Sequence, residues 1–164
     1  MSEGTRILKF IVGADAPDTS EVPEVLRPCP PISQAELDAA KRKRFEFDHS
    51  NSSWTINGEP VHIDHPVATP AENSPQRWTF INGSGGWAHP VHVHLDFMRV
   101  LRRNGQLPPL NERDGMAKKD TIALGPNETV EVFIRFRDFR GRFVFHCHNR
   151  EHEDHAMMAR FDVV

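Results

Sequence analysis

The 164-residue chain lacks the features that would place it in a membrane or on nucleic acid. It has no apolar run near the ~18 residues of a membrane-spanning helix. Its first residues, MSEGTRILKFIVGADAP, lack the basic, apolar and small-residue order of a signal peptide. The formal net charge is -3 at pH 7, and we expect the basic clusters at 41–44 and 99–103 to be solvated ends of elements. We therefore expect neither a membrane nor a nucleic acid as a partner.

Cysteine is scarce, with only Cys29 and Cys147 present. The chain has no C-x2-C pair, which is the usual cysteine spacing of a structural zinc site. Cys147 lies in a histidine-rich run, where a thiolate ligand is more useful than a disulfide. Cys29 lies in RPCPPI and is expected to be a free thiol in a linker, with a bridge to another chain as the alternative.

From residue 45 onward the chain consists of short β-rich runs: FEFD, SWTING, QRWTFING, HVHLDFMRVLRRNG, DTIALGPNETVEVFIRF, GRFVFHCH and MARFDVV. Turn signals separate these runs, as Asn-Gly pairs or as PNE, at 57–58, 82–83, 104–105 and 126–128. This spacing is typical of an all-β protein. We predict a Greek-key β-sandwich over residues 31–164.

The first part of the chain has a different character. RILKFIV at 6–12 is a good strand, but a Pro- and acid-rich linker follows it up to residue 30. A lone strand leaves its backbone groups unpaired, so we predict that it pairs with the sheet of a neighbouring domain; a frayed tail is the alternative. The one helical stretch is ISQAELDAAKRKR, in which Ser33 and Glu36 have the spacing of a capping box.

Two histidine-rich motifs carry the chemistry, AHPVHVHLDF at 88–97 and FVFHCHNREHEDHAMM at 143–158. In extended strands, successive side chains point to opposite faces. The side chain of Cys147 then points to the face opposite that of its two histidine neighbours. In the first motif, the side chain of His89 likewise points to the face opposite that of His92 and His94. We predict two metal centres, the first built on His89 and Cys147. The second is built from the four other histidines of these strands: His92, His94, His146 and His148.

The residues after the second strand complete the first centre. His152 and Met157 follow Cys147 at five-residue steps, in the pattern C-x4-H-x4-M. A thiolate, two imidazoles and an axial thioether form the ligand set diagnostic of blue copper, whereas zinc, the second choice, does not favour a thioether. The remaining candidates are expected to be surface, core or supporting residues: His49, His62, His65, His155 and Met158.

HPVHVH and HCHNREHEDHAMM resemble the two C-terminal copper motifs of the multicopper oxidases, especially the branch of laccases, bilirubin oxidase and phenoxazinone synthase. WTFING, KKDTIALGPNETVEVFIRF and RILKFIV extend the resemblance over nearly the whole chain. The resemblance implies that residues 1–30 are the last strand of a preceding cupredoxin domain plus a linker. Residues 31–164 would be the C-terminal cupredoxin domain, with a type 1 copper site and half of a trinuclear copper site.

The resemblance also implies a role for each motif residue. It assigns the type 1 copper ligands His89, Cys147, His152 and axial Met157, the type 2 ligand His92, and the type 3 ligands His94, His146 and His148. In this family an electron enters at type 1 copper, commonly through the exposed edge of the histidine at the position of His152. It then crosses the Cys147–histidine link to the trinuclear cluster, where dioxygen becomes water. Cys147 and His152 are therefore expected to be catalytic.

Glu153 matches an acid that this branch associates with proton delivery. Reduction of dioxygen consumes protons, and a carboxylate beside the cluster can relay them. A surface salt bridge is the alternative role for Glu153 or Asp154.

The trinuclear cluster of the family also takes histidines from two HxH motifs of domain 1, and no such second set occurs in this sequence. We therefore expect an N-terminal partner chain that supplies domains 1 and 2, as though a three-domain oxidase were divided between two polypeptides; an engineered fragment or a proteolytic product would have the same sequence. The reducing substrates would be phenols or similar small molecules, and Asn149 and Arg150 favour a polar or anionic donor. The alternatives are a stand-alone blue-copper electron-transfer protein and self-assembly of several copies, but an electron carrier has no use for four histidines on one face.

Overall fold

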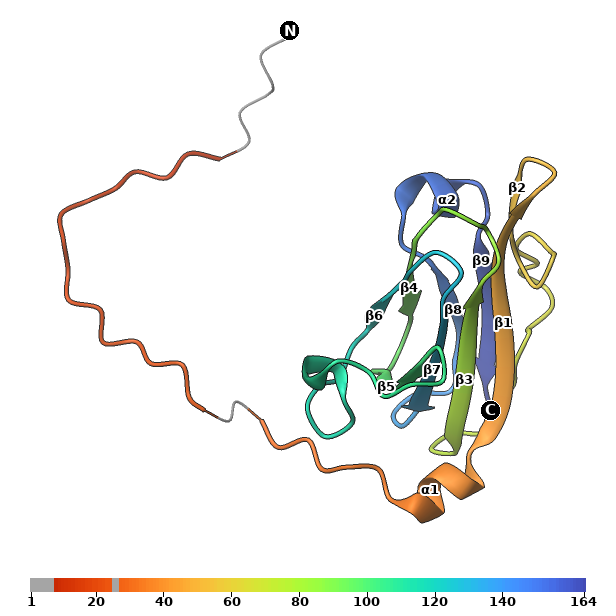
Figure 1. Ribbon diagram of the computed structural model, residues 1–164, viewed down its shortest axis with the longest axis horizontal. Coiled ribbons are helices and arrows are strands. Elements are labelled where there is room, and N and C mark those ends of the chain that lie inside the picture. The colour runs from red at the N-terminus through yellow and green to blue at the C-terminus, as the bar shows by residue number, and fades with distance from the viewer. Residues whose placement is uncertain (1–7, 25–26) are drawn as a thin grey trace, which may run out of the picture.

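The computed structural model describes residues 8–24 and 27–164 and shows a β-sandwich of two sheets (Figure 1). The five-stranded sheet has the order β2-β1-β3-β7-β5: β2 Ser53–Ile56, β1 Lys41–Ser50, β3 Pro75–Asn82, β7 Thr129–Arg135 and β5 Arg99–Arg103. The four-stranded sheet has the order β6-β4-β8-β9: β6 Thr121–Leu124, β4 His89–Val93, β8 Gly141–Cys147 and β9 Met158–Val163. The short helices are α1 Gln34–Ala39, the 3-10 helix η1 Leu110–Glu112, and α2 Arg150–Asp154.

The connections confirm the all-β sandwich that the sequence predicts. β1 and β3 pair in parallel, and the other neighbouring strands pair in antiparallel fashion. From β3 to β8 each successive strand lies in the opposite sheet. This alternation brings β4 and β8, which carry the two motifs, side by side in the middle of the four-stranded sheet.

Aromatic side chains fill the space between the sheets. β3 alternates strictly between half-buried and buried residues, so that Trp78 and Phe80 point inward. They pack with Phe45 and Phe47 from β1 and Phe145 from β8, and the rings of Phe45 and Phe145 lie 4.6 Å apart. Burial of each such side chain contributes about 1.5–3 kcal/mol. This core holds β4 and β8 in fixed positions, with their motif residues at one end.

The predicted helix is shorter than the stretch ISQAELDAAKRKR. The capping box of Ser33 and Glu36 is confirmed, but the helix ends at Ala39. The basic run 41–44 instead begins β1, because pairing with β3 starts at Lys41 and the alternating burial of the phenylalanines that follow requires an extended chain. The prediction that the helical stretch runs to residue 44 is therefore wrong.

The run HVHLDFMRVLRRNG is likewise not one segment. The chain leaves the four-stranded sheet after Val93, turns at Leu95 with φ 84°, and enters the other sheet at Arg99. The Asn-Gly pairs at 57–58 and 104–105 form turns with positive φ, as predicted. The pair at 82–83 does not, because Asn82 ends β3 as a buried residue with a hydrogen-bonded side chain.

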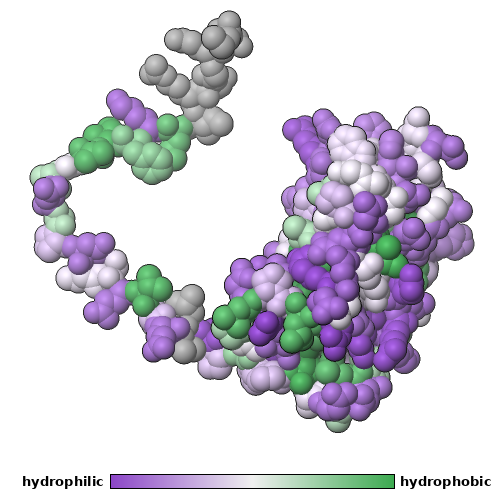
Figure 2. All heavy atoms as spheres, in the orientation of Figure 1, coloured by the Kyte–Doolittle hydropathy of each residue, from purple (hydrophilic) through white to green (hydrophobic). Residues whose placement is uncertain are grey.

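Residues 8–12 of the predicted N-terminal strand form no strand in this chain, and residues 6 and 7 lie outside the described residues. Leu8, Phe10, Ile11 and Val12 are all more than two-thirds exposed. Figure 2 shows hydrophobic side chains along this segment, in contrast to the mostly hydrophilic face of the sandwich. Pairing with another domain stays a prediction. Among the described residues, no helix is both long and apolar enough to span a membrane.

Candidate metal centres

The first group of candidate ligands is buried at one end of the sandwich. His89 is the first residue of β4, Cys147 is the last residue of β8, and His152 lies on α2. His152 Nδ1 lies 3.2 Å from His89 Nδ1 and 3.3 Å from Cys147 Sγ. The three candidate ligand atoms all lie within 4.8 Å of one another, and all three residues are buried. The structure thus brings together three of the four residues predicted for the first centre.

The loop after β8 returns His152 and Met157 to the same end. Asn149 caps α2 by accepting a hydrogen bond from Glu151 N at 3.1 Å. Met157 N donates to His152 O at 3.0 Å, and Cys147 N donates to Met157 O at 3.1 Å. These bonds close the loop on itself, and Met157 is fully buried. The residues of the C-x4-H-x4-M pattern therefore belong to a loop whose ends are hydrogen-bonded to each other, and not to one continuous helix or strand.

Burial sets the protonation of this group. It lowers the pKa of His89 to about 4, with a further contribution from the neighbouring His152, and it also lowers the pKa of His152. Burial raises the pKa of the Cys147 thiol to about 11. The backbone N–H of Asn149 lowers this pKa by hydrogen bonding, but its effect is smaller than that of burial. At neutral pH the group therefore consists of two neutral imidazoles and a thiol. One soft sulfur and two imidazoles, beside a buried thioether, are a donor set that fits copper.

The second group lies on the other face of the same two strands. His92 and His146 are cross-strand partners, and His94 Nε2 lies 3.3 Å from His146 Nε2. The candidate ligand atoms of these three residues lie within 4.8 Å of one another. His148 is not part of that tight set; its ring lies 5.4 Å from that of His146 and 5.6 Å from that of His92. Three of the four predicted histidines are thus together, with the fourth at their edge.

Hydrogen bonds orient two of these rings. His92 Nδ1 lies 3.0 Å from Asp120 O, and His146 Nδ1 lies 3.2 Å from Cys147 O. A carbonyl oxygen only accepts, so both Nδ1 atoms donate and both Nε2 atoms keep a lone pair. This group is open: His146 is buried, whereas His94 and His148 are exposed.

Glu153 reaches the second group from α2. Its Oε2 lies 3.5 Å from His146 Nδ1, whereas the surface ion pair of α2 joins Arg150 to Asp154 at 3.9 Å. The alternative surface role therefore fits Asp154 better than Glu153.

Two tryptophans, which the motifs do not contain, cover His152. Trp54 from β2 stacks on the His152 ring at 3.7 Å and 23°, and Trp87 meets it edge-on at 5.7 Å. His152 is only 1% exposed as a result, so it lacks the exposed edge that the resemblance implies. His49, predicted to be an ordinary surface residue, stacks on the Trp54 ring at 4.0 Å. Trp87 could have been noticed two residues before His89, but nothing in the sequence links the hairpin of Trp54 to α2.

The fold and these two groups define a class of protein: a cupredoxin-like sandwich that carries a buried cysteine–histidine group, a candidate metal site, back to back with a histidine cluster. The profile of the multicopper oxidase family matches residues 32–164, and the chain belongs to that family.

The chain is 37% identical over 166 residues to the bilirubin oxidase of Albifimbria verrucaria, covering 96% of this chain and 28% of that protein. It is 33% identical over 152 residues to the laccase of Haloferax volcanii, covering 89% of this chain and 26% of that protein. A solved multi-copper oxidase from Pediococcus acidilactici superimposes with a TM-score of 0.77 at 27% identity, covering 90% of this chain and 30% of that one. The chain thus spans less than a third of the length of these relatives.

Proposed function

We propose that this chain is the C-terminal copper domain of a laccase-like multicopper oxidase and that a partner chain supplies domains 1 and 2. The observation that carries the proposal is the back-to-back arrangement of a buried cysteine–histidine group and an open histidine group on one pair of strands. The residues that would hold copper are His89, Cys147, His152 and Met157 for type 1 copper, His92 for type 2 copper, and His94, His146 and His148 for the type 3 pair. Copper bound in these places would take electrons singly from a donor and reduce dioxygen to water.

The difference in burial between the groups supports a partner chain. The three gathered side chains of the first group, from His89, Cys147 and His152, are buried within this chain. The second presents His94 and His148 to solvent, although hydrated imidazoles gain nothing from being gathered on one face. A partner that supplies the missing histidines would cover this face and form a large interface.

The chain's own residues would link the two groups. Cys147 contributes its sulfur to the first group, and its backbone neighbours His146 and His148 belong to the second. Glu153 lies beside His146, at 3.5 Å from its Nδ1, and its carboxylate is placed to hold or pass on a proton for the reduction of dioxygen. The donor would be a phenol or a similar small molecule. Arg150, whose side chain is 94% exposed, favours a polar or anionic one.

Oxygen consumption with and without the partner tests the proposal. The chain alone and the chain mixed with a two-domain N-terminal partner should both turn blue with copper, but only the mixture should consume oxygen with a phenolic donor. Oxygen consumption by the isolated monomer would contradict the requirement for a partner. Blue colour without oxygen consumption in any mixture would favour the stand-alone electron-transfer protein.

Three variants separate the two groups in the same assay. Cys147→Ser should abolish the blue band and the oxygen consumption together, because both need the thiolate. His92→Ala should keep the blue band and abolish oxygen consumption. His65→Ala, which removes an exposed histidine outside both groups, is the matched control and should change neither.

A further inference from the structure

A chain of hydrogen bonds leads away from His89 on the side opposite the other ligands. His89 Nε2 lies 2.6 Å from Ser84 Oγ, and Ser84 Oγ lies 2.7 Å from Asn82 Oδ1. The other ring nitrogen, Nδ1, is the one that faces His152. Ser84, which is itself bonded to Asn82, therefore contacts the imidazole at the nitrogen that a metal ion in the first group does not need.

The backbone fixes the orientation of the Asn82 amide. Asn82 Nδ2 lies 2.7 Å from Trp87 O and 2.8 Å from Gly125 O, which only accept hydrogen bonds. Asn82 Oδ1 lies 3.0 Å from Ser84 N, which only donates. Exchanging the amide oxygen and nitrogen would lose all three bonds, so Oδ1 must face Ser84.

The amide in turn fixes the Ser84 hydroxyl and the His89 ring. The hydroxyl has one proton, and Asn82 Oδ1 at 2.7 Å can only accept it. The contact at 2.6 Å between Ser84 Oγ and His89 Nε2 must then use a lone pair of the hydroxyl, so His89 Nε2 is the donor. His89 carries its proton on Nε2, and its Nδ1 keeps a lone pair directed at the other members of the group.

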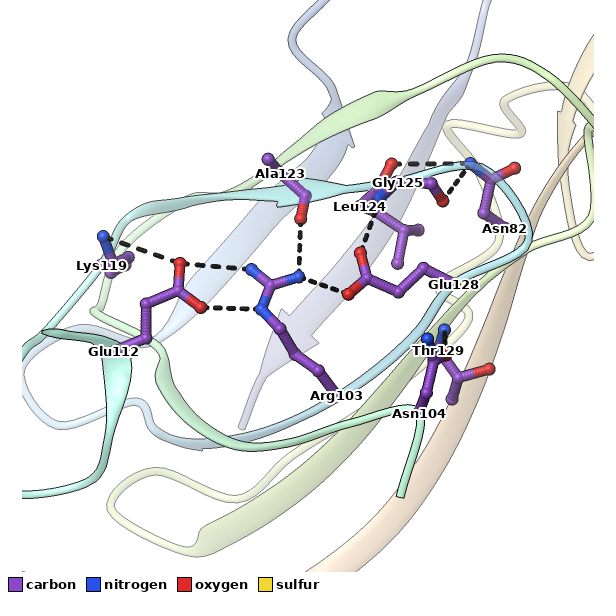
Figure 3. A network of polar contacts seen from close by, with 10 residues as sticks. All are labelled: Asn82, Arg103, Asn104, Glu112, Lys119, Ala123, Leu124, Gly125, Glu128 and Thr129. Carbon is purple, nitrogen blue, oxygen red and sulfur yellow. Dashed lines mark hydrogen bonds and ion pairs between the residues drawn. The ribbon is translucent and has the colours of Figure 1, made fainter. Parts of the chain in front are cut away.

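This arrangement is anchored well beyond the site. Glu128 accepts a hydrogen bond from Gly125 N at 2.7 Å through one carboxylate oxygen and from Arg103 at 2.9 Å through the other. Figure 3 shows Asn82 at one end of this network and Arg103, held on its other side by Glu112, at the centre. The acceptor of the Asn82 amide therefore belongs to a rigid part of the fold.

We propose that Ser84 and Asn82 are positioning residues that hold His89 in the Nε2–H tautomer, so that Nδ1 is ready to bind the metal ion of the first group. The inference rests on the proposed function only for the identity of the metal, copper. Partners of this kind behind metal-ligating histidines typically contribute about 10–100-fold to metal affinity.

Nuclear magnetic resonance of the metal-free chain, labelled with 15N in its histidines, tests the tautomer directly. The wild-type signals of His89, assigned by their loss in His89→Gln, should show a single tautomer with the proton on Nε2. Ser84→Ala should give a mixture of tautomers, whereas Ser84→Thr, which keeps the hydroxyl, should restore the single one. Ser74→Ala removes a hydroxyl with two hydrogen-bond partners far from His89 and should leave the His89 signals unchanged.

Copper affinity gives the second readout. Ser84→Ala should bind copper about 10–100-fold more weakly than the wild type, and Ser84→Thr should recover most of the loss. A proton on Nδ1 of His89 in the wild type, or an unchanged tautomer and affinity in Ser84→Ala, would overturn the proposal. The tautomer measurement uses no partner, metal or oxygen. A failure of the oxidase assay therefore would not change its outcome.

Discussion

Metal binding at the buried group should release one proton, and that proton should come from Cys147. A metal ligand must be a thiolate, but burial raises the pKa of this thiol to about 11. At pH 7 only about one molecule in ten thousand carries the thiolate, and removing the proton costs about 5 kcal/mol of the binding free energy. The two imidazoles are already neutral, because burial lowers the pKa values of His89 and His152 below the ordinary 6.5.

The pH dependence follows from these protonation states. Between about pH 7 and 9 the thiol is protonated and both histidines are neutral, so each rise of one pH unit should strengthen metal binding about tenfold. Cobalt(II) is a suitable probe because it gives a thiolate charge-transfer band without oxidising the thiol. Its affinity for the metal-free chain should therefore rise about 100-fold from pH 7 to 9. Calorimetry in buffers of different ionisation enthalpy should count one proton released per ion.

Variants of the two cysteines make the test specific. Cys29→Ser should keep the slope and the charge-transfer band, because Cys29 belongs to neither group. Cys147→Ser should lose the band. An affinity that does not change with pH in the wild type, or binding without proton release, would refute the assignment of a protonated, metal-binding Cys147.

Three further predictions concern the surroundings of the site. Trp54→Ala should uncover His152, so that diethyl pyrocarbonate modifies this histidine several-fold faster, while Trp54→Phe should retain most of the protection. Because burial lowers the pKa of His89 to about 4, the unfolded chain binds a proton between pH 6.5 and 4 that the folded metal-free chain does not; the folded chain should therefore be about 3 kcal/mol less stable near pH 4 than above pH 6.5, and denaturant titrations of His89→Gln should lack that loss. Arg103→Met should lower the free energy of unfolding by about 1–3 kcal/mol because it removes the guanidinium that Glu112 and Glu128, both largely buried, share, whereas Arg140→Met, at an exposed ion pair, should cost less than about 1 kcal/mol.

The parity of the two motifs could be predicted because it is a local property. Side chains alternate along any extended strand, so Cys147 must point away from His146 wherever β8 lies in the sheet. The structure shows this separation, with the first group buried on one face and the second open on the other. The assignment of copper types to these residues stays a prediction.

The cover of His152 could not be predicted in the same way. Trp54 contacts this ring only because the hairpin of β1 and β2 lies beside α2, nearly a hundred residues further along the chain. The turn predicted at the Asn-Gly pair 82–83 fails for a related reason. The side-chain amide of Asn82 hydrogen-bonds to carbonyl groups of β6 and of the turn that follows it, which lie about forty residues further along the chain.

The two groups also differ in what the chain alone can complete. Asn82, Ser84 and Trp54 support the ligands of the buried group, and all of these residues come from this chain. In the second group, hydrogen bonds through Nδ1 leave Nε2 of His92 and of His146 with a lone pair, but among the described residues nothing encloses the exposed His94 and His148. We therefore expect the isolated chain to bind one copper ion tightly at the buried group. The remaining ions should be retained only after the proposed partner chain has covered the open face.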